Sequence, residues 1–399
     1  MARGKIKLAP ACAGSEVEDW QLTENRSLSY GAPDAANMLI YGDNLAALQL
    51  LEARCAASIK CIFIDPPYNT GSMFEHYDDG ADSDVWLSQM RQRLKLMRRL
   101  LRPDGVIAVQ IDYREAARLK LLLDEVFDRQ FRNEIIVKRG TKNVQHQFDT
   151  IDALASGHDS ILLYANSPDT RFRHCMSQLD KPQPGTWNNH WRGTNRPTMR
   201  YEIFGIRPES GQWRWSEERT RGAMRNHEQY LAETGGQMSI DDYYLSKLQT
   251  EGIALNFVRL SRTGKPEHYV PPRSYRILSD LWLDIPMSGS ITRFPHEKHE
   301  ALLFRILHWL TDEGDWVLDA YLGTGTTAAA AHKMNRRWIG IESGTHIHDF
   351  ALPRLKRVVD GSCRQGISTQ LDWQGGGGFR GYELASAHAE HAHPDIYMA

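Results

Sequence analysis

The 399-residue sequence predicts an α/β fold in which one mostly parallel, doubly wound sheet is interrupted by an inserted domain. Short apolar runs alternate with segments of helical spacing over residues 38–165, and the same rhythm returns over residues 291–360. Between these stretches, residues 166–290 are rich in Trp, Arg, Gly and Pro and break the rhythm. We therefore expect two halves of a single sheet domain that are separated by an insert.

The first half opens with a short strand at residues 38–41, and Asp43 or Asn44 can cap the helix that follows. Residues 59–64 form an apolar run that predicts a buried strand. Leu and Met recur at helical spacing over residues 84–101, and the basic polar face of this helix is typical of a solvated surface. The remaining elements are a turn at residues 103–105, a helix at residues 114–126, and strands at residues 106–111, 134–137 and 160–164.

The second half begins with a helix from residue 297 and centres on a glycine loop between two strands. The strand at residues 316–318 leads into Gly323 and Gly325, an alanine-rich helix follows, and a second strand ends at Glu342. Glycines allow close approach of a ligand, and an acid at this position accepts hydrogen bonds from ribose hydroxyls. The loop is neither GxGxxG nor a phosphate loop, so a nucleoside cofactor without phosphates, such as S-adenosylmethionine, fits better than a dinucleotide or ATP.

The tetrapeptide Asp65-Pro66-Pro67-Tyr68 follows the predicted strand at residues 59–64. In open α/β sheets the carboxyl ends of the strands form the ligand-binding edge. Two prolines stiffen the turn, so the Asp65 carboxylate and the Pro66 carbonyl could together accept both hydrogens of an exocyclic NH2 group. Tyr68 adds a face on which a planar base can stack. The alternative interpretation is an ordinary surface turn, because Asp, Pro and Tyr are common at strand ends.

In this order, residues 65–68 and 319–326 resemble the motifs of the β group of amino-methylating DNA methyltransferases. More narrowly, the chain resembles the modification subunit of type III restriction-modification systems. The likeness spans residues 38–384, with further matching stretches at residues 40–45, 64–71, 156–159, 294–298 and 366–384. It implies a Rossmann-like S-adenosylmethionine-dependent methyltransferase sheet with an inserted target-recognition domain. It also implies methylation of the N6 amine of adenine in DNA, in a restriction-modification or phage-defence system.

The resemblance assigns catalysis to Asp65, Pro66, Pro67 and Tyr68, with the pocket rim at residues 69–71. The residues that it assigns to the cofactor are Asp43, Lys298, Asp319, Tyr321, Gly323, Gly325, Thr326 and Glu342. Within this set, Asp43 would contact the adenine of the cofactor, Lys298 its carboxylate and Glu342 its ribose. The target base must leave the helix stack to reach such a pocket. Most of the rate gain would come from positioning and from fixed dipoles.

The sequence departs from the family pattern at two motif positions and in length. Ala320 stands where the family usually has Pro, which removes a stiff turn and lowers the expected cofactor affinity. His299 stands where a Pro usually follows the lysine. Type III modification subunits are usually longer, so we expect a C-terminal portion to be missing. His158 and Asp159 match the family, and we interpret them as structural residues that brace the sheet.

Three alternative functions stay open on the sequence alone. The same clamp would serve the N4 amine of cytosine, although Asp at its first position favours adenine. A DNA-binding subunit that is active only with a partner is motivated by Ala320 and by the short C-terminus. An RNA methyltransferase is disfavoured because the insert lacks a known RNA-binding module. No cysteine is placed as a nucleophile, which argues against methylation of cytosine C5.

The insert carries the candidate DNA contacts. Residues 185–225 hold eight Arg and no Lys against four Glu, together with four Trp, although the formal net charge of the whole chain is only −2. Arg suits two-pronged contacts to phosphate or guanine, and aromatic rings can stack on bases. The candidate DNA-binding residues are Arg192, Arg196, Arg200, Arg214, Trp213 and Trp215. The alternative is a small β-rich domain with Trp in its own core and Arg on its surface.

Composition excludes several other classes. No apolar window approaches the length of a membrane span, and no signal pattern opens the chain. Five scattered Cys without a CxxC pair argue against a zinc site or a disulfide framework and favour a cytoplasmic protein. We expect no metal, and we expect the histidines at positions 388, 391 and 393 to lie in a disordered tail.

The expected organisation is an N-terminal arm at 1–37, a catalytic half at 38–165, an insert at 166–290, a cofactor-binding half at 291–360 and a glycine-rich extension at 361–399. The expected partners are double-stranded DNA and either a second copy of the chain or a restriction subunit. The DNA recognition sequence depends on geometry in the insert and is not readable from the residues.

Overall fold

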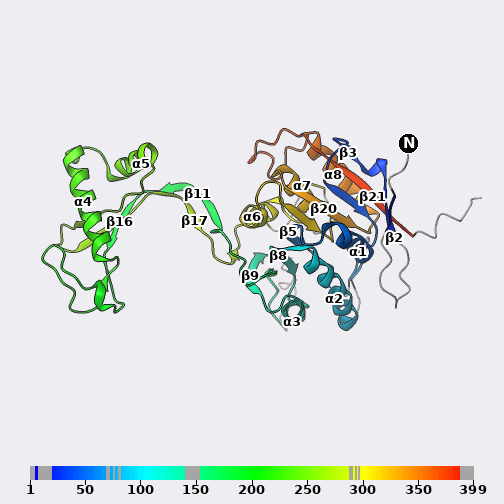
Figure 1. Cartoon of the computed structure of the whole chain (residues 1–399), viewed down its shortest axis with the longest axis horizontal. Helices are drawn as coiled ribbons and strands as arrows, with labels where there is room; N and C mark the ends of the chain where they lie inside the picture. The colour runs from blue at the N-terminus through cyan, green and yellow to red at the C-terminus, as the bar shows by residue number, and fades with distance from the viewer. Residues whose placement is uncertain are drawn as a thin grey trace, which may run out of the picture. The chain divides into compact units, whose positions relative to one another are not determined.

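The computed structural model describes residues 5–7, 20–68, 72–74, 77–79, 82–139, 153–286, 291, 292, 294 and 297–386. The chain divides into two compact units (Figure 1). The first unit comprises residues 1–175 and 278–399, and the second unit comprises residues 176–277. Each unit has a core of its own and is described by itself.

A 12-stranded sheet forms the centre of the first unit. Its middle six strands are parallel, and in spatial order they are β21 (Gly378–Ser386), β4 (Met38–Tyr41), β20 (Arg337–Glu342), β19 (Trp316–Asp319), β5 (Ile59–Ile64) and β8 (Leu101–Ile111). Beyond β21 lie the antiparallel strands β2 (Trp20–Glu24) and β1 (Lys5–Lys7), while the two-residue β3 (Tyr30–Gly31) also pairs with β21. Beyond β8 lie β10 (His158–Ala165), β9 (Phe131–Lys138) and β18 (Leu281–Trp282).

Helices cover both faces of this sheet, which confirms the predicted doubly wound α/β fold (Figure 1). One face packs against α1 (Asn44–Cys55), α2 (Ser83–Leu100) and α3 (Ala116–Val126). The other face packs against α6 (Glu300–Leu310), α7 (Thr326–Lys333) and α8 (Leu352–Val359). A short π-helix (Ile347–Ala351) directly precedes α8. Along β5, Ile62 and Ile64 face the first layer and Cys61 and Phe63 face the second. A strand that is buried on both faces is apolar throughout, as the sequence indicated.

Two elements of the first half differ slightly from expectation. The turn expected at residues 103–105 is part of β8, which starts at Leu101 and shifts register against β5 between Ile59 and Cys61. The extra residues of β8 are accommodated by this irregularity, so the strand bends without ending. Two short strands, β6 (Ser72–Phe74) and β7 (Tyr77–Asp79), form a separate antiparallel pair.

The prediction of a loose arm at residues 1–37 is wrong for residues 20–31. Residues 20–31 do not form a loose arm, because β2 lies in the central sheet and a short 3-10 helix (Arg26–Leu28) follows it. Leu22 and Leu28 are fully buried on opposite faces of the sheet. Ordering this largely polar segment costs chain entropy, and the burial of the two leucines offsets that cost.

The glycine-rich extension also belongs to the sheet. β21 pairs with β4 on one side and with β2 on the other. Its start lies so close to Gly31 that a Cβ there would meet the Gly377 carbonyl oxygen at 2.4 Å. Glycines thus allow two backbones to meet within the segment that was expected to be a glycine-rich extension. The histidines predicted to lie in a disordered tail are outside the described residues.

The second unit is smaller and mixed in structure. Its strands form three small antiparallel sheets. In the first, β11 (Met176–Gln183) pairs with β17 (Arg273–Ile277), and in the second, β16 (Pro266–Val270) lies between β12 (Thr186–Asn189) and β15 (Val258–Leu260). In the third, β13 (Trp191–Arg192) pairs with β14 (Gln212–Trp213). A short 3-10 helix (Pro197–Met199) and the helices α4 (Glu217–Thr234) and α5 (Ile240–Glu251) complete it. Aromatic rings form its main core, at Tyr230, Tyr243, Tyr244, Phe257 and Tyr269.

The boundaries of this unit are narrower than the expected insert at residues 166–290. Residues 166–175 and 278–286 belong to the first unit, because β18 pairs with β9 and Arg173 donates to the Trp309 carbonyl at 2.9 Å. The Leu278 N–H donates to the Cys175 carbonyl at 2.9 Å, so the chain leaves and re-enters the first unit at adjacent points.

Candidate active site

The Asp65 carboxylate lies directly beyond the carboxyl end of β5 and is held by two donors. Tyr68 Oη donates to Asp65 Oδ1 at 2.6 Å, and Lys298 Nζ lies 2.6 Å from Asp65 Oδ2. The Trp86 indole N–H donates to the Pro67 carbonyl at 3.0 Å, which fixes the turn against α2. Among the described residues, no donor contacts the Pro66 carbonyl. The arrangement therefore leaves this carbonyl available beside an oriented carboxylate.

The electrostatics of this turn favour a neutral Tyr68 phenol. Burial raises the pKa of the Tyr68 phenol well above its ordinary value, and the nearby carboxylate of Asp65 adds to this effect. The Lys298 ammonium lies 5.4 Å from the centre of the Tyr68 ring. Tyr68 thus stays a hydrogen-bond donor over the physiological pH range, and its ring lies beside a cation. Residues 69–71, expected at the rim of the pocket, lie outside the described residues.

A charged cluster at the ends of β8, β9 and β10 adjoins this turn, and the sequence reasoning missed most of it. Arg139 Nη1 lies 3.1 Å from Asp112 Oδ2 and 3.4 Å from Asp159 Oδ1. Gln110 Nε2 donates to Asp159 Oδ2 at 3.3 Å. Burial raises the pKa of Asp159, while Lys298 and Arg139 oppose that rise. The rule that polar residues after strands of one direction lie at the same end of a sheet could have found Asp112 and Arg139, but not Asp159, which lies at the start of the antiparallel β10.

The cofactor loop starts at Asp319, whose carboxylate holds the loop in shape. Its Oδ1 accepts from the Tyr321 backbone N–H at 2.9 Å and its Oδ2 accepts from Thr327 Oγ1 at 2.6 Å. Burial raises the pKa of Asp319 to about 7. Gly323 and Gly325 have φ of +54° and +78°, a left-handed conformation that glycine adopts without strain. Asp319 is therefore a residue that builds the loop.

Glu342 ends β20 and meets the glycine loop from the neighbouring strand. Its Oε2 accepts from the Gly323 N–H at 2.7 Å and its Oε1 accepts from the Gly344 N–H at 2.8 Å. The carboxylate lies at the place where an acid would accept hydrogen bonds from a ribose. Carboxylate oxygens have further lone pairs, so both can still accept from a ligand.

Asp43 caps a helix in the structure, and its neighbour Asn44 compensates for Ala320. Asp43 Oδ1 accepts from two backbone N–H groups of the first turn of α1, at 2.9 and 3.1 Å, and Arg93 lies 3.3 Å from Oδ2. Asn44 Nδ2 donates to the Ala320 carbonyl at 2.9 Å. This bond fixes the turn that a proline would stiffen in the family pattern, and no local sequence pattern indicates it.

The structure brings the clamp and the cofactor loop together at one edge of the sheet. β5 and β19 are parallel neighbours, and β19 and β20 are parallel neighbours in turn. Asp65, Asp319 and Glu342 follow or end these three strands, and both Asp65 and Glu342 contribute to the raised pKa of Asp319. The turn at residues 65–68 and the glycine loop thus form one candidate site within the first unit.

The candidate DNA contacts of the second unit divide into exposed and structural residues. Arg192, Arg196 and Arg214 are exposed. Arg200 donates to the Gly211 carbonyl at 2.7 Å, so its guanidinium holds a loop of the unit. Trp213 is only 2% exposed and donates to a backbone carbonyl in a small core, which rules out stacking of its ring on a base in this conformation.

Two further tryptophans flank these residues. Trp215 is half-buried against two histidine rings, and the Arg219 guanidinium lies 4.2 Å from its ring centre. Trp191 is 41% exposed and pairs with Trp213 across β13 and β14. Trp191 is therefore the more accessible ring. The sequence alone does not show how the two strands pair, so it could not predict which of the two rings is exposed.

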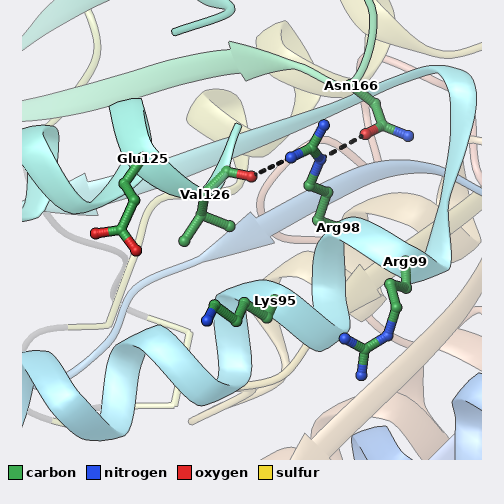
Figure 2. Close-up of a pocket in the computed structure, with 6 residues that line it drawn as sticks. All are labelled: Lys95, Arg98, Arg99, Glu125, Val126 and Asn166. Atoms are coloured by element: carbon green, nitrogen blue, oxygen red, sulfur yellow. Dashed lines mark hydrogen bonds between the residues drawn. The ribbon is translucent and has the colours of Figure 1, made fainter. Parts of the chain in front are cut away.

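A pocket of about 400 Å³ lies at the far end of α2 (Figure 2). Its lining includes Lys95, Arg98 and Arg99 on the basic face of α2, and the two arginines are paired within the protein. Arg98 donates to the Val126 carbonyl and to Asn166, as Figure 2 shows, and also pairs with Asp128. Arg99 pairs with Glu52. α2 starts beside the turn at residues 65–68 and ends where β8 begins. This pocket therefore lies at the amino ends of the parallel strands, whereas the site lies at their carboxyl ends.

The fold is a Rossmann-like domain in which the Asp65 turn and a glycine loop lie together at the carboxyl ends of neighbouring parallel strands. The model of the N6/N4 DNA methylase family matches residues 59–352, and the chain belongs to that family. None of the helices in the described parts of the chain has the length and apolar character needed to cross a membrane.

Curated relatives and solved structures resemble the chain over most of its length. It is 32% identical to the probable type III restriction-modification enzyme HindVI Mod subunit of Haemophilus influenzae, over 90% of this chain but only 55% of that subunit. It is 29% identical to the type II methyltransferase M.EcaI of Enterobacter cloacae, over 85% of this chain and 73% of the relative. A DNA modification methylase structure, TTHA0409 of Thermus thermophilus, superposes with a TM-score of 0.44 at 15% identity, covering 87% of this chain and 99% of that one.

Proposed function

We propose that this protein transfers a methyl group from S-adenosylmethionine to the N6 amine of adenine in double-stranded DNA. The observation that carries the proposal is the meeting of two motifs at one sheet edge. There, an oriented Asp65 carboxylate with a free neighbouring carbonyl lies beside a glycine loop that Glu342 caps. Membership of the DNA methylase family supports both halves of this assignment.

The chemistry follows from the two acceptors of the clamp. The adenine amine is a poor nucleophile because its lone pair is delocalised into the ring. When the Asp65 carboxylate and the Pro66 carbonyl each accept one N–H, the nitrogen becomes tetrahedral and its lone pair points at the methyl group. The N–C bond would then form as the C–S bond of the sulfonium breaks, with the electron pair staying on sulfur as a thioether, and the nitrogen would lose one proton to water through the Asp65 carboxylate. S-adenosylmethionine supplies the electrophilic methyl group, and the protein supplies orientation and fixed charge.

Tyr68 and Lys298 prepare the acceptor before the base arrives. The Tyr68 hydroxyl fixes the rotation of the carboxylate, and its ring offers a stacking surface for a base that has left the duplex. Lys298 pairs with Asp65 at 2.6 Å and holds the second oxygen of the carboxylate in place. In this proposal Lys298 also serves the carboxylate of the cofactor when it is bound.

The residues of the glycine loop fit a nucleoside cofactor. The left-handed glycines place backbone, and no side chain, against the ligand. Glu342 would accept from the ribose hydroxyls, while Gly323, Gly325 and Thr326 line the methionine side and Tyr321 adds an aromatic wall. Asp319 contributes by shaping the loop. Asp43 lies at the end of β4 on the same edge, where the adenine of the cofactor is expected.

The second unit is proposed to recognise the DNA target. Arg192, Arg196 and Arg214 are the exposed cations among the predicted contacts, and they suit phosphate or guanine. The name of the Haemophilus relative, a Mod subunit, motivates a role in a restriction-modification system, as a dimer or with a restriction subunit. The cytoplasmic location expected from the cysteines stays a prediction.

N4 methylation of cytosine is the second candidate, because the matching family covers both amines and the clamp serves either. A subunit that depends on a partner for turnover is a weaker candidate, since the Asn44 bond to the Ala320 carbonyl supplies the order that the missing proline would give.

The test is methylation of unmethylated genomic DNA by the purified protein with labelled S-adenosylmethionine, followed by mass spectrometry of the nucleosides. Asp65→Ala is the matched inactive variant. We expect N6-methyladenine from the wild type alone. N4-methylcytosine would select the second candidate, and cofactor binding without any methylated base would contradict the proposal in favour of a partner-dependent subunit.

A further inference from the structure

Four charged side chains lie wholly inside the first unit, around the segment that carries Lys298. Arg354 of α8 donates to Glu297 through Nη1 at 3.1 Å and to Glu300 through Nη2 at 2.8 Å. Lys333 of α7 donates to the other carboxylate oxygen of Glu300 at 2.8 Å. The exposed fraction of all four side chains is 0%. Two cations and two anions balance each other, and a buried group of this kind is stable only when it is complete.

Arg354 also reaches the cofactor loop. Its Nη1 donates to Thr326 Oγ1 at 2.8 Å, and Thr326 Oγ1 lies 3.3 Å from the backbone carbonyl of Lys298 in donor geometry. One guanidinium therefore holds the chain on both sides of Lys298, through Glu297 and Glu300, and also holds the first residue of α7. The fork of the guanidinium can satisfy two carboxylates and a hydroxyl at once, which a lysine ammonium on a single stem cannot reproduce.

We propose that Arg354 is a positioning residue for methyl transfer, which acts by placing the Lys298 ammonium on the Asp65 carboxylate. This inference rests on the function proposed above. Lys298 reaches Asp65 at 2.6 Å through a long flexible side chain, so the contact is reproducible only where the backbone of the segment is fixed. Arg354 touches neither the clamp nor the glycines of the loop, and its effect passes through the segment at residues 297–300.

Lys333 provides a matched control. Arg354→Met and Lys333→Met each remove one buried cation from Glu300, but only Arg354 contacts Glu297 and Thr326. Both variants lower Tm. At saturating DNA and S-adenosylmethionine, and at a temperature where every variant is folded, Arg354→Met lowers kcat about 100-fold and Lys333→Met less than about threefold. Arg354→Lys keeps the charge but not the fork, and stays about 10-fold below the wild type.

The deciding measurement is a double-mutant cycle with Lys298→Met. If Arg354 acts through Lys298, adding Arg354→Met to Lys298→Met changes kcat by less than about threefold. Losses that multiply, or equal losses in the Arg354 and Lys333 variants, overturn the proposal. Where Arg354→Met does not fold, Arg354→Lys replaces it in the same cycle. A wild type that methylates no DNA overturns the proposed function and this inference with it, whereas an active wild type with multiplying losses overturns this inference alone.

Discussion

At the scale of single residues, the Asp65 carboxylate is oriented before any substrate is present. Tyr68 donates to one of its oxygens and Lys298 pairs with the other. A preformed acceptor does not have to reorganise when the amine arrives, and enzymes gain most of their electrostatic catalysis in this way. The roles of the two donors can be separated, because the hydroxyl of Tyr68 can be removed without its ring.

Tyr68→Phe should lower kcat by about 10- to 100-fold, because a hydrogen bond to a charged group contributes on the order of 1.5–3 kcal/mol. Binding of DNA that carries an unpaired target base should change little, because the ring remains. Single-turnover methylation and equilibrium DNA binding measure the two effects. Tyr68→Ala is the comparison that removes the ring as well, and a binding loss in Tyr68→Phe equal to that in Tyr68→Ala would contradict the assignment of stacking to the ring.

Asp319 should make stability depend on pH in an unusual direction for a carboxylate. Burial raises its pKa in the folded protein to about 7, above the ordinary value of 3.8. A raised pKa means that the stabilising contribution of this group is complete below pH 3.8 and is lost as the pH rises through about 7. The Tm of the wild type relative to Asp319→Asn should therefore fall between pH 5 and pH 8 by on the order of a few °C. Thermal melts at several pH values test this, and a constant or rising difference would refute it.

Residues that carry the motif chemistry were readable from the sequence, and residues that support them were not. Asp65 and Glu342 follow apolar runs, so the strand rule places them at the ligand edge. Asn44 and Arg354 act on residues far away in the chain, on the Ala320 carbonyl and on Glu297. Contacts of this kind depend on which helices cover which face, and local sequence pattern does not encode that.

At the scale of elements, two basic surfaces that look alike in the sequence differ in the structure. On α2, most of the cations are paired with carboxylates of the protein, for example Arg98 with Asp128 and Arg99 with Glu52. In the second unit, the exposed Arg192, Arg196 and Arg214 have no carboxylate partner among the described residues. Unpaired cations are the ones that release counterions from DNA phosphates.

Replacing Arg192, Arg196 and Arg214 by Ala should weaken DNA binding, and each phosphate contact that is lost should reduce the salt slope by about one. The affinity for S-adenosylmethionine should not change. Arg98→Ala with Arg99→Ala is the control on α2, and DNA binding should be retained there. DNA titrations at several salt concentrations test both predictions. An equal loss of DNA affinity in the α2 control would contradict the assignment of DNA binding to the second unit.

The helices were predicted more closely than the strands. The expected helices at residues 84–101 and 114–126 agree with α2 and α3 within two residues at each end, because apolar periodicity marks them. β2 and β21 were missed, since short strands rich in glycine and polar residues carry no comparable period. Their place in the sheet depends on pairing between the two ends of the chain.

At the scale of the whole molecule, the insertion point separates the unit proposed to recognise DNA from the unit that holds the candidate active site. The Leu278 N–H donates to the Cys175 carbonyl, so the two cut ends of the first unit are adjacent. Deletion of residues 176–277 with a short glycine linker should leave a folded protein that binds S-adenosylmethionine within about threefold of the wild type. Specific DNA methylation should be lost. Calorimetry and circular dichroism measure the first result, and an unfolded deletion variant would show that the sheet domain needs its insert.

The position of β21 has a consequence for synthesis. β21 lies between β2 and β4, although it holds the last residues that the structure describes and β2 holds nearly the first. On the ribosome, β5 and β8 can pair as they emerge, whereas β4 has no strand partner among the described residues until β20 follows. Residues 20–24 can pair with β1 early, but their second neighbour is absent until residues 378–386 leave the exit tunnel. Contacts between such distant segments form slowly, so Leu22 and its strand stay without this second partner until those residues have been translated.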